Sequence, residues 1–375
     1  MKKYVTLGEV CKLNMGQSPD SSTYNDHGEG IPFYQGNADF GDIHPVTAHW
    51  CTYPTKIAEN GDILISVRAP IGALNIATEQ CCIGRGLASI TVDSKIVSRD
   101  YIWYALKSRV AALQAMGTGS TFKAINKNVL NDMQFLLPTL EEQANIAQNL
   151  SKIDTAINIC TQLMNKLDML VKSRFVEMFG DIVHDYNIPK VLLSELADVG
   201  SSKRIYANEY VDDGIPFYRS KEIRELGSGL KPSTELFITN ERYKEIKEKY
   251  GVPKIGDILI AAIGATIGYS WIVDTESPFY YKDGNLIILS VKDNVNSVFL
   301  NHTMGILIED FKNKGVSGSA QLALTIEKLE KMPVVNPNFV LQNQFAAFVE
   351  QTDKSKFIAI NTMKIVRRVR IYDQF

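Results

Sequence analysis

Apolar residues recur with a regular period between residues 139 and 180. The steps between them alternate four and three residues, which gives the 3.5-residue period of a coiled-coil seam. Pro138 and a capping box of Thr139 and Glu142 mark the start of this stretch, and Gly180 marks its end. We predict one helix over residues 139–180, about 60 Å long at roughly 1.5 Å per residue. Its seam residues are Ile146, Leu150, Ile153, Ile157, Cys160, Met164, Leu167 and Val171.

The C-terminal residues 338–375 repeat the beginning of this helix. At one constant offset, Pro138 and Gln143 recur as Pro337 and Gln342. The second helix has a less regular apolar seam, because polar residues interrupt it, and we assign the seam to Ile358, Ile365 and Val369. A helix as long as the first needs a partner, so we predict that the two helices lie side by side. The alternative is two separate surface helices, each packed on its own domain.

The rest of the chain is also duplicated. The segments Gly30–Tyr34 and Gly61–Ile65 recur as Gly214–Tyr218 and Gly256–Ile260. Matches concentrate at glycines, prolines and apolar strands, which set the backbone, while the stretches between them differ. We predict two copies of one unit with a pseudo-two-fold internal repeat. The boundaries follow as a first globular domain (1–138), a central helix (139–180), a second globular domain (181–337) and a C-terminal helix (338–375).

The sequence of each globular half predicts an α+β fold. Short apolar strands are expected at 62–67, 75–77 and 87–92 in the first half, and at 257–263, 269–273 and 285–291 in the second. Helices are expected at 100–116 and 297–312. A polar, glycine-rich loop follows each of these helices, and such loops can carry function.

The composition excludes some classes of function but does not identify one. The 375 residues carry a formal net charge of −2, with 45% hydrophobic and 22% charged residues, so there is no overall basic signal for nucleic acid. The five cysteines form no Cys-x-x-Cys pair, which argues against a zinc site and fits a reducing cytoplasm. The apolar run 258–273 is short and interrupted by glycine, so we expect no membrane span and no signal peptide.

The sequence shows no catalytic motif. It contains neither a phosphate-binding loop of the Walker type nor a dinucleotide-binding glycine fingerprint. The histidines are scattered, and paired acids such as Asp212-Asp213 look like turn residues rather than general acid–base pairs. We therefore expect no metal, no cofactor and no enzymatic activity in this chain.

The remaining hypothesis is that the chain recognises DNA. Arginine, lysine, glutamine and serine in ordered loops are the side chains that contact base edges and phosphates. Arg68 directly follows a repeated strand, and Arg85 lies between two glycines. The candidate DNA-binding residues are Arg68, Arg85, Ser120, Lys123, Lys203, Arg204, Arg219, Lys221, Lys282, Ser319 and Gln321.

Over its whole length the chain resembles the specificity subunit of type I restriction–modification enzymes. The residues that carry the resemblance are the repeated Gly-Asp-Ile-Leu-Ile strand, the run Val67–Gly72, the Gly-Ser loops at 119 and 318, and the Pro-x₄-Gln helix starts. The second copy departs from the first at Arg68, because Ala262-Ile263-Gly264-Ala265 has no arginine.

The resemblance implies a division of labour. Each globular half would be a target-recognition domain for one half-site of double-stranded DNA, and the long helices would pair as an antiparallel coiled coil that sets the spacer. The chain itself would be non-catalytic. Two methyltransferase subunits would bring S-adenosylmethionine, and motor–nuclease subunits would bring ATP and Mg²⁺.

Two other function classes stay open. One is a single-chain enzyme acting on DNA with widely spaced catalytic carboxylates. The other is a scaffold or ligand-binding protein built from duplicated modules, with no DNA specificity. Activity of the purified chain alone would reveal the first, and the absence of selective DNA binding in the presence of partner subunits would indicate the second.

Overall fold

The computed structural model describes residues 3–119, 123–315 and 323–372, and the side chains of 4–119, 123–314 and 323–366. The chain forms two compact units. The first contains residues 1–161 together with 360–375, and the second contains residues 162–359. Each unit combines helices with mostly antiparallel sheets, which confirms the predicted α+β class.

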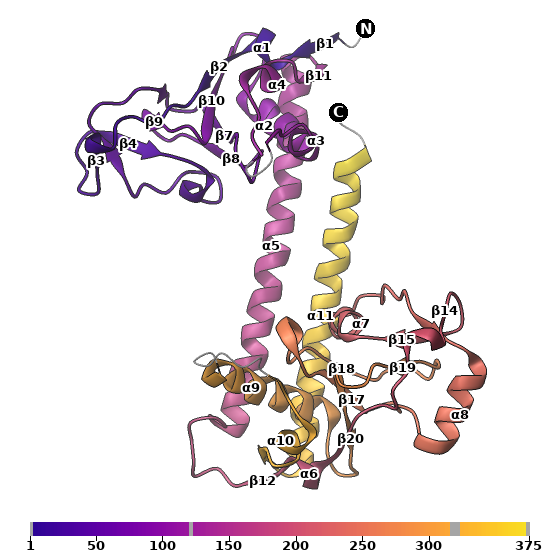
Figure 1. Ribbon diagram of the computed structural model, residues 1–375. Coiled ribbons are helices and arrows are strands. Elements are labelled where there is room, and N and C mark those ends of the chain that lie inside the picture. The colour runs from indigo at the N-terminus through magenta and orange to yellow at the C-terminus, as the bar shows by residue number, and fades with distance from the viewer. Residues whose placement is uncertain (1–2, 120–122, 316–322, 373–375) are drawn as a thin grey trace. The chain divides into compact units, whose positions relative to one another are not determined.

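The first unit contains three small sheets (Figure 1). A two-stranded ladder joins β1 (Lys3–Thr6) to β11 (Gln134–Leu137). The antiparallel four-stranded sheet has the order β2 (Cys11–Met15), β10 (Leu87–Val92), β7 (Ile63–Ser66), β8 (Leu74–Ile76). The five-stranded sheet has the order β3 (Tyr24–Asn25), β5 (Trp50–Cys51), β4 (Ile31–Tyr34), β9 (Cys81–Ile83), β6 (Ile57–Ala58), and β4 and β9 run parallel.

Both faces of the four-stranded sheet are covered, which explains its uninterrupted apolar strands. Ile63 and Ile65 of β7 pack in the main core with α2 (Arg99–Ser108), while Leu64 packs in a second core with Tyr34. Tyr34 is buried and its hydroxyl lies 2.7 Å from Thr47 Oγ1, as a core residue would. The other helices of this half are α1 (Leu7–Val10), α3 (Val110–Ala115) and α4 (Lys127–Asn131), with 3-10 turns η1 (Ser21–Thr23) and η2 (Asn37–Asp39).

The helix predicted at 100–116 is in fact two helices. Arg109 has φ −101° and ψ 3°, which ends α2 and begins α3. The apolar period continues through this break, because Leu106 and Leu113 both face the core, so the pattern alone gave no sign of it.

The second unit repeats the topology of the first. Its four-stranded sheet has the order β13-β20-β17-β18, and β15 pairs in parallel with β19 as β4 does with β9. The strands are β12 (Lys190–Leu192), β13 (Ala197–Gly200), β14 (Tyr210–Val211), β15 (Ile215–Tyr218), β16 (Phe237–Ile238), β17 (Ile258–Ala261), β18 (Ser270–Ile272), β19 (Tyr280–Tyr281), β20 (Leu286–Val291) and β21 (Pro333–Val335). This agreement confirms the internal repeat.

Helices of the second unit follow the first with two additions. The shared elements are α6 (Leu193–Leu196), η3 (Ala207–Glu209), α9 (Ser297–Gly315) and α10 (Ile326–Glu330). The 3-10 turn η4 (Gly264–Thr266) lies between β17 and β18, and the described residues between β7 and β8 contain no such turn. The additions are α7 (Ser220–Gly227) and α8 (Asn240–Tyr250), which lie in the divergent stretch between β15 and β17. Part of the difference between the two copies is therefore helical.

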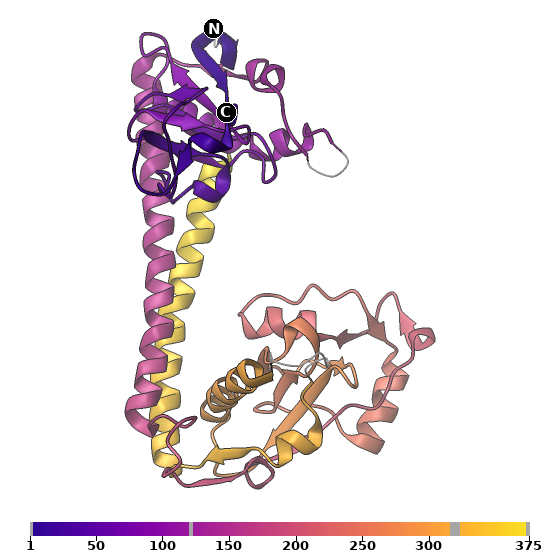
Figure 2. The ribbon, with the colours of Figure 1, turned by 60° about the vertical axis from the view of Figure 1, so that its left-hand side comes forward.

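The two long helices are α5 (Leu140–Phe179) and α11 (Phe339–Tyr372), and they run antiparallel (Figures 1 and 2). In the second unit Phe175 contacts Phe345 at a ring-centroid distance of 5.3 Å, and Lys356 Nζ lies 2.7 Å from Asp168 Oδ1. In the first unit Thr161 Oγ1 donates to Met363 Sδ at 3.7 Å. From one contact to the next, the residue number falls along α5 and rises along α11, as expected for antiparallel helices. The coiled-coil geometry stays a prediction.

The contact face of α11 differs from the predicted seam. Ile358 and Ile365 are 67% and 64% exposed, so their assignment to the seam is corrected. The buried positions form a stripe that continues from Phe345 to Val349, Thr352, Ala359 and Met363. The prediction was wrong because it ranked positions by hydrophobicity. This face includes small and polar side chains, whose polar groups form local hydrogen bonds, and the two isoleucines lie outside it. The side chain of Val369 lies outside the described residues.

The repeated glutamine of the Pro-x₄-Gln motif ties each long helix to its globular half. Gln143 is fully buried; its Oε1 accepts from Ser98 N at 2.8 Å and its Nε2 donates to Pro138 O at 2.9 Å. Gln342 makes the same bonds, to Asn296 N at 2.9 Å and Pro337 O at 2.8 Å. One side chain therefore satisfies the backbone at the starts of two helices, which explains why both copies carry it.

Candidate nucleic-acid interface

Three loops of the first half meet at Val67, just beyond the end of β7. Val67 N donates to Gly86 O at 2.9 Å, and Val67 O accepts from Ile125 N at 2.9 Å. Arg68 also forms an antiparallel bridge with Ala124. The structure thereby brings together the loops that carry the predicted residues Arg68, Arg85 and Lys123.

Local bonds fix the shape of these loops. Ser66 Oγ lies 2.7 Å from both Arg68 O and Pro70 O, which closes the turn after β7. A Cβ on Gly86 would lie 2.4 Å from Gln35 O, so glycine is required where these backbones approach. These contacts hold the turns that display the arginines.

The three cations of this cluster are exposed. Within the part of the chain that the structure describes, Arg68, Arg85 and Lys123 make no ion pair. Cations without carboxylate partners on adjacent loops form a local positive site that the overall charge of −2 conceals. Ser120, the fourth predicted residue of this half, lies outside the described residues.

The second half has the same three-loop frame without these cations. Ala262 N donates to Asn285 O at 2.8 Å, and Ala262 O accepts from Leu324 N at 2.9 Å. The bridge of Arg68 to Ala124 is replaced by one of Ile263 to Ala323. Asn285 occupies the position of Gly86, and the residue before it is Gly284 in place of Arg85. The two halves share the backbone frame, but the second half does not share its positive charges.

The predicted cations Lys203, Arg204 and Lys282 lie around β19. Lys203 N donates to the Tyr280 hydroxyl at 2.7 Å, and its ammonium lies 5.2 Å from the Tyr250 ring centroid. Arg204 pairs with Asp283 at 2.7 Å, and this hydrogen bond raises the pKa of the guanidinium. Lys282 continues the β15–β19 pairing by donating its N–H to Tyr218 O. Arg204 is therefore tied to a carboxylate, unlike Arg68.

Arg219 and Lys221 belong to an ion-pair network on α7. Arg219 contacts Glu222 and Glu235 at 3.2 Å each, and Lys221 contacts Glu235 at 2.9 Å. The Glu222 side chain is fully buried, and its hydrogen bond is the main cause that raises the pKa of Arg219. We infer a structural role for Arg219, because freeing it would leave a buried carboxylate unpaired. Ser319 and Gln321 lie outside the described residues.

Arg224 is a further exposed cation that was not among the residues predicted from the sequence. Its guanidinium carbon lies 5.9 Å from the ring centroid of Tyr269, at the start of β18, and both side chains are exposed. The repeat could not reveal this pair, because α7 has no counterpart in the first half.

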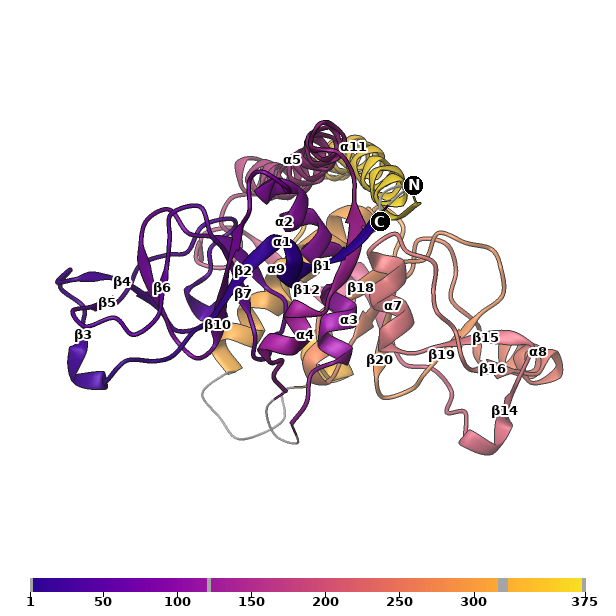
Figure 3. The same cartoon turned by 90° about the horizontal axis from the view of Figure 1, so that it is seen from above.

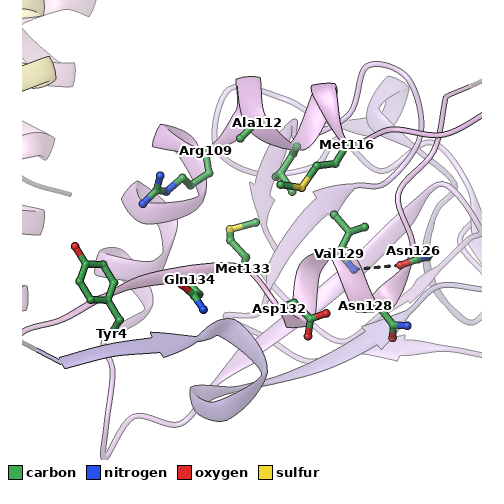
Figure 4. A pocket seen from close by; sticks show the side chains of 11 residues that line it. Tyr4, Arg109, Ala112, Met116, Asn126, Asn128, Val129, Asp132, Met133 and Gln134 are labelled. Carbon is green, nitrogen blue, oxygen red and sulfur yellow. Dashed lines mark hydrogen bonds between the residues drawn. The ribbon is translucent and has the colours of Figure 1, made fainter.

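A cavity of about 630 Å³ in the first unit lies apart from the predicted residues (Figure 4). Tyr4, Arg109, Met116, Val129 and Gln134 are among its lining residues. In the second unit the positions matching Leu113 and Val129 hold Phe311 and Lys328, whose cation–ring distance is 5.4 Å.

Among the described residues, no group of three or more histidine, cysteine, aspartate or glutamate side chains could hold a metal ion. Burial raises the pKa of Cys11 and Cys81 to about 12 and that of Cys82 to about 11, which keeps these thiols protonated. Within the described ranges, no helix is both long and apolar enough to cross a bilayer.

The duplicated frame matches one known family over nearly its whole length. Residues 2–169 and 188–367 each match the type I restriction modification DNA specificity domain. The chain belongs to this family. It is 47% identical over 157 residues to the type I restriction enzyme MjaX specificity subunit of Methanocaldococcus jannaschii, an alignment that covers 41% of this chain and 37% of the relative. A specificity subunit of Haemophilus influenzae is 33% identical over 162 residues, which cover 42% of this chain and 39% of the relative.

The alignments therefore span less than half the length of these two relatives. A solved S subunit of the type I restriction–modification system of M. genitalium matches the whole fold, with a TM-score of 0.62, 17% identity, and coverage of 99% of this chain and 94% of that one. A chain from a structure of type I system complex assembly matches with a TM-score of 0.57, 17% identity, and coverage of 98% and 95%. Both likenesses show a shared fold and nothing beyond it.

Proposed function

We propose that this chain is the non-catalytic DNA-binding subunit of a type I restriction–modification complex. Each globular half recognises one half-site of a bipartite target in double-stranded DNA. The observation that carries the proposal is the shared three-loop frame with different charges in its two copies. One scaffold with unlike side chains suits the reading of two unlike sequences.

The spacer between the half-sites is set by α5 and α11. Both helices begin at a buried glutamine fixed to a globular half, so their length is coupled to the recognition domains. Half-sites must lie on reachable faces of the duplex, which restricts the allowed gap.

Partner subunits supply the chemistry in this proposal. Two methyltransferase subunits bind the chain and bring S-adenosylmethionine, and motor–nuclease subunits join through the complex and bring ATP and Mg²⁺. The long helices expose apolar side chains for such contacts, including Ile159, Met169, Phe357, Ile358 and Ile365. Partners would also share the phosphate contacts, so the chain need not be strongly basic.

The test is selection from a random duplex pool by the chain co-purified with its methyltransferase. Enrichment of two short motifs separated by a fixed gap is the expected result. A single contiguous motif would mean that only one half reads DNA. No enrichment by a folded complex would overturn the proposal in favour of a scaffold.

A further inference from the structure

The second half lacks the cations that the first half places at its loop frame. The residues that follow Val67 and precede Gly86 and Ala124 in the first half are Arg68, Arg85 and Lys123. Their counterparts in the second sequence are Ile263, Gly284 and Leu322. If both halves bind DNA, the positive charge near this frame in the second half must come from other positions, such as the partly exposed Lys282 before Asn285 or a neighbouring element.

Helix α7 lies where it can supply that charge. It packs against β17 and against η4, the turn that follows Ile263. It also packs against β18 (Figure 3). A Cβ on Gly227 would lie 2.1 Å from Ser270 O, so the end of α7 sits directly on β18. The helix therefore has a fixed position beside the turn that corresponds to the Arg68 turn.

Arg224 is the uncommitted cation of this helix. Arg219 and Lys221 are bound to Glu222 and Glu235. The neighbouring Glu225 accepts from Ser233 N and Ser233 Oγ at 2.7 Å each, and these bonds lower the pKa of its carboxyl. In the described part of the chain, Arg224 makes no ion pair and rests instead over Tyr269.

We propose that Arg224, held over the Tyr269 ring, is a DNA-contacting cation of the second half and takes the place of Arg68. A guanidinium stacked on an aromatic face keeps its N–H groups free for phosphate oxygens or for guanine O6 and N7. The ring limits the arginine's freedom before DNA arrives, which reduces the entropy lost on binding. This inference rests on the proposed DNA-binding function.

The test measures binding of the full chain, in complex with its methyltransferase, to a duplex carrying the selected target over a range of salt concentrations. Arg224→Gln keeps a long side chain and removes the charge. The expected result is affinity about tenfold or more lower, with a slope of log K against log salt shallower by about one. Tyr269→Ala should weaken binding in the same direction, while Tyr269→Phe keeps the ring and should bind like the parent.

Lys331→Ala is the matched control, because it removes an exposed cation of the same unit that is paired with Glu327 at 2.7 Å. It should leave the affinity and the salt slope unchanged. Arg224→Gln with parental affinity and slope, beside a parent that binds selectively, would overturn this inference alone. A parent that shows no selective binding would overturn the proposed function first, so the two failures are distinguishable. Retained affinity in Arg224→Lys would identify a phosphate contact, and lost affinity a contact with a base.

Discussion

At the scale of single residues, side chains of the same type lie in different environments and have different roles. Arg68 and Arg219 are both arginines at strand ends of the repeat. Arg68 is exposed beside two other loops, whereas Arg219 is held by a buried glutamate. Ion-pair partners, rather than residue type, separate the two.

Arg68→Ala should weaken binding through the first half-site. Loss of one phosphate or base contact costs about 1–3 kcal/mol, and the salt slope should fall by about one. Titration with the selected duplex measures both quantities. Lys95→Ala, an exposed lysine of the same half, is the matched control, and equal effects of the two substitutions would contradict a specific role for Arg68.

Gln143→Ala should destabilise the first unit by about 3 kcal/mol. The substitution leaves the Ser98 N–H and the Pro138 carbonyl without their buried partner. Thermal unfolding, together with hydrogen exchange of the α2 amides, would locate the loss. Gln148→Ala on the exposed side of the same helix is the control, and a similarly small effect of both changes would refute the anchoring role.

At the scale of elements, the long helices show where periodicity succeeds and where it fails. Along α5 the predicted positions from Ile146 to Val171 are partly or fully buried, and Ile159 and Leu163 beside them are exposed. Along α11 the contact face includes Thr352 and Lys356. The lysine can lie there because Asp168 and Asp353 bind its ammonium; burial opposes its charge, but these hydrogen bonds outweigh it and the pKa of Lys356 is raised.

The packing of α9 on α11 should depend on pH. The His302 ring lies at 5.3 Å from Phe345, and burial lowers the pKa of this histidine below its usual 6.5. The unfolded chain then binds a proton that the folded unit does not. Stability is therefore present above the unfolded pKa and declines below it, by at most about 1.4 kcal/mol per pH unit.

The measurement is the melting temperature of the second unit's transition between pH 7.5 and 5.5. His302→Phe should flatten the profile, because the replaced ring cannot titrate. An unchanged profile in His302→Phe would assign the acid sensitivity to other groups.

At the scale of the whole molecule, the proposed function makes the spacer and the half-sites separable properties. Removing residues 164–170 and 354–360 deletes facing heptads of both long helices, including the paired Asp168 and Lys356. A heptad spans about 10 Å, which corresponds to about three base pairs at 3.4 Å each. Selection from a random pool should then return the same two half-sites with a shorter gap. A change in half-site identity would show that the helices do not set the spacing.

The sequence by itself determined the features that depend on local periodicity and backbone restriction. The duplication, the α+β class, the long helices and the buried face of α5 all follow from apolar spacing and from glycine and proline positions. Tertiary structure alone decided which charges act together. Arg68, Arg85 and Lys123 are far apart in sequence, and two backbone hydrogen bonds at Val67 connect their loops. Arg224 gains its place because α7 packs on β18, and no local pattern encodes a contact between elements so distant along the chain.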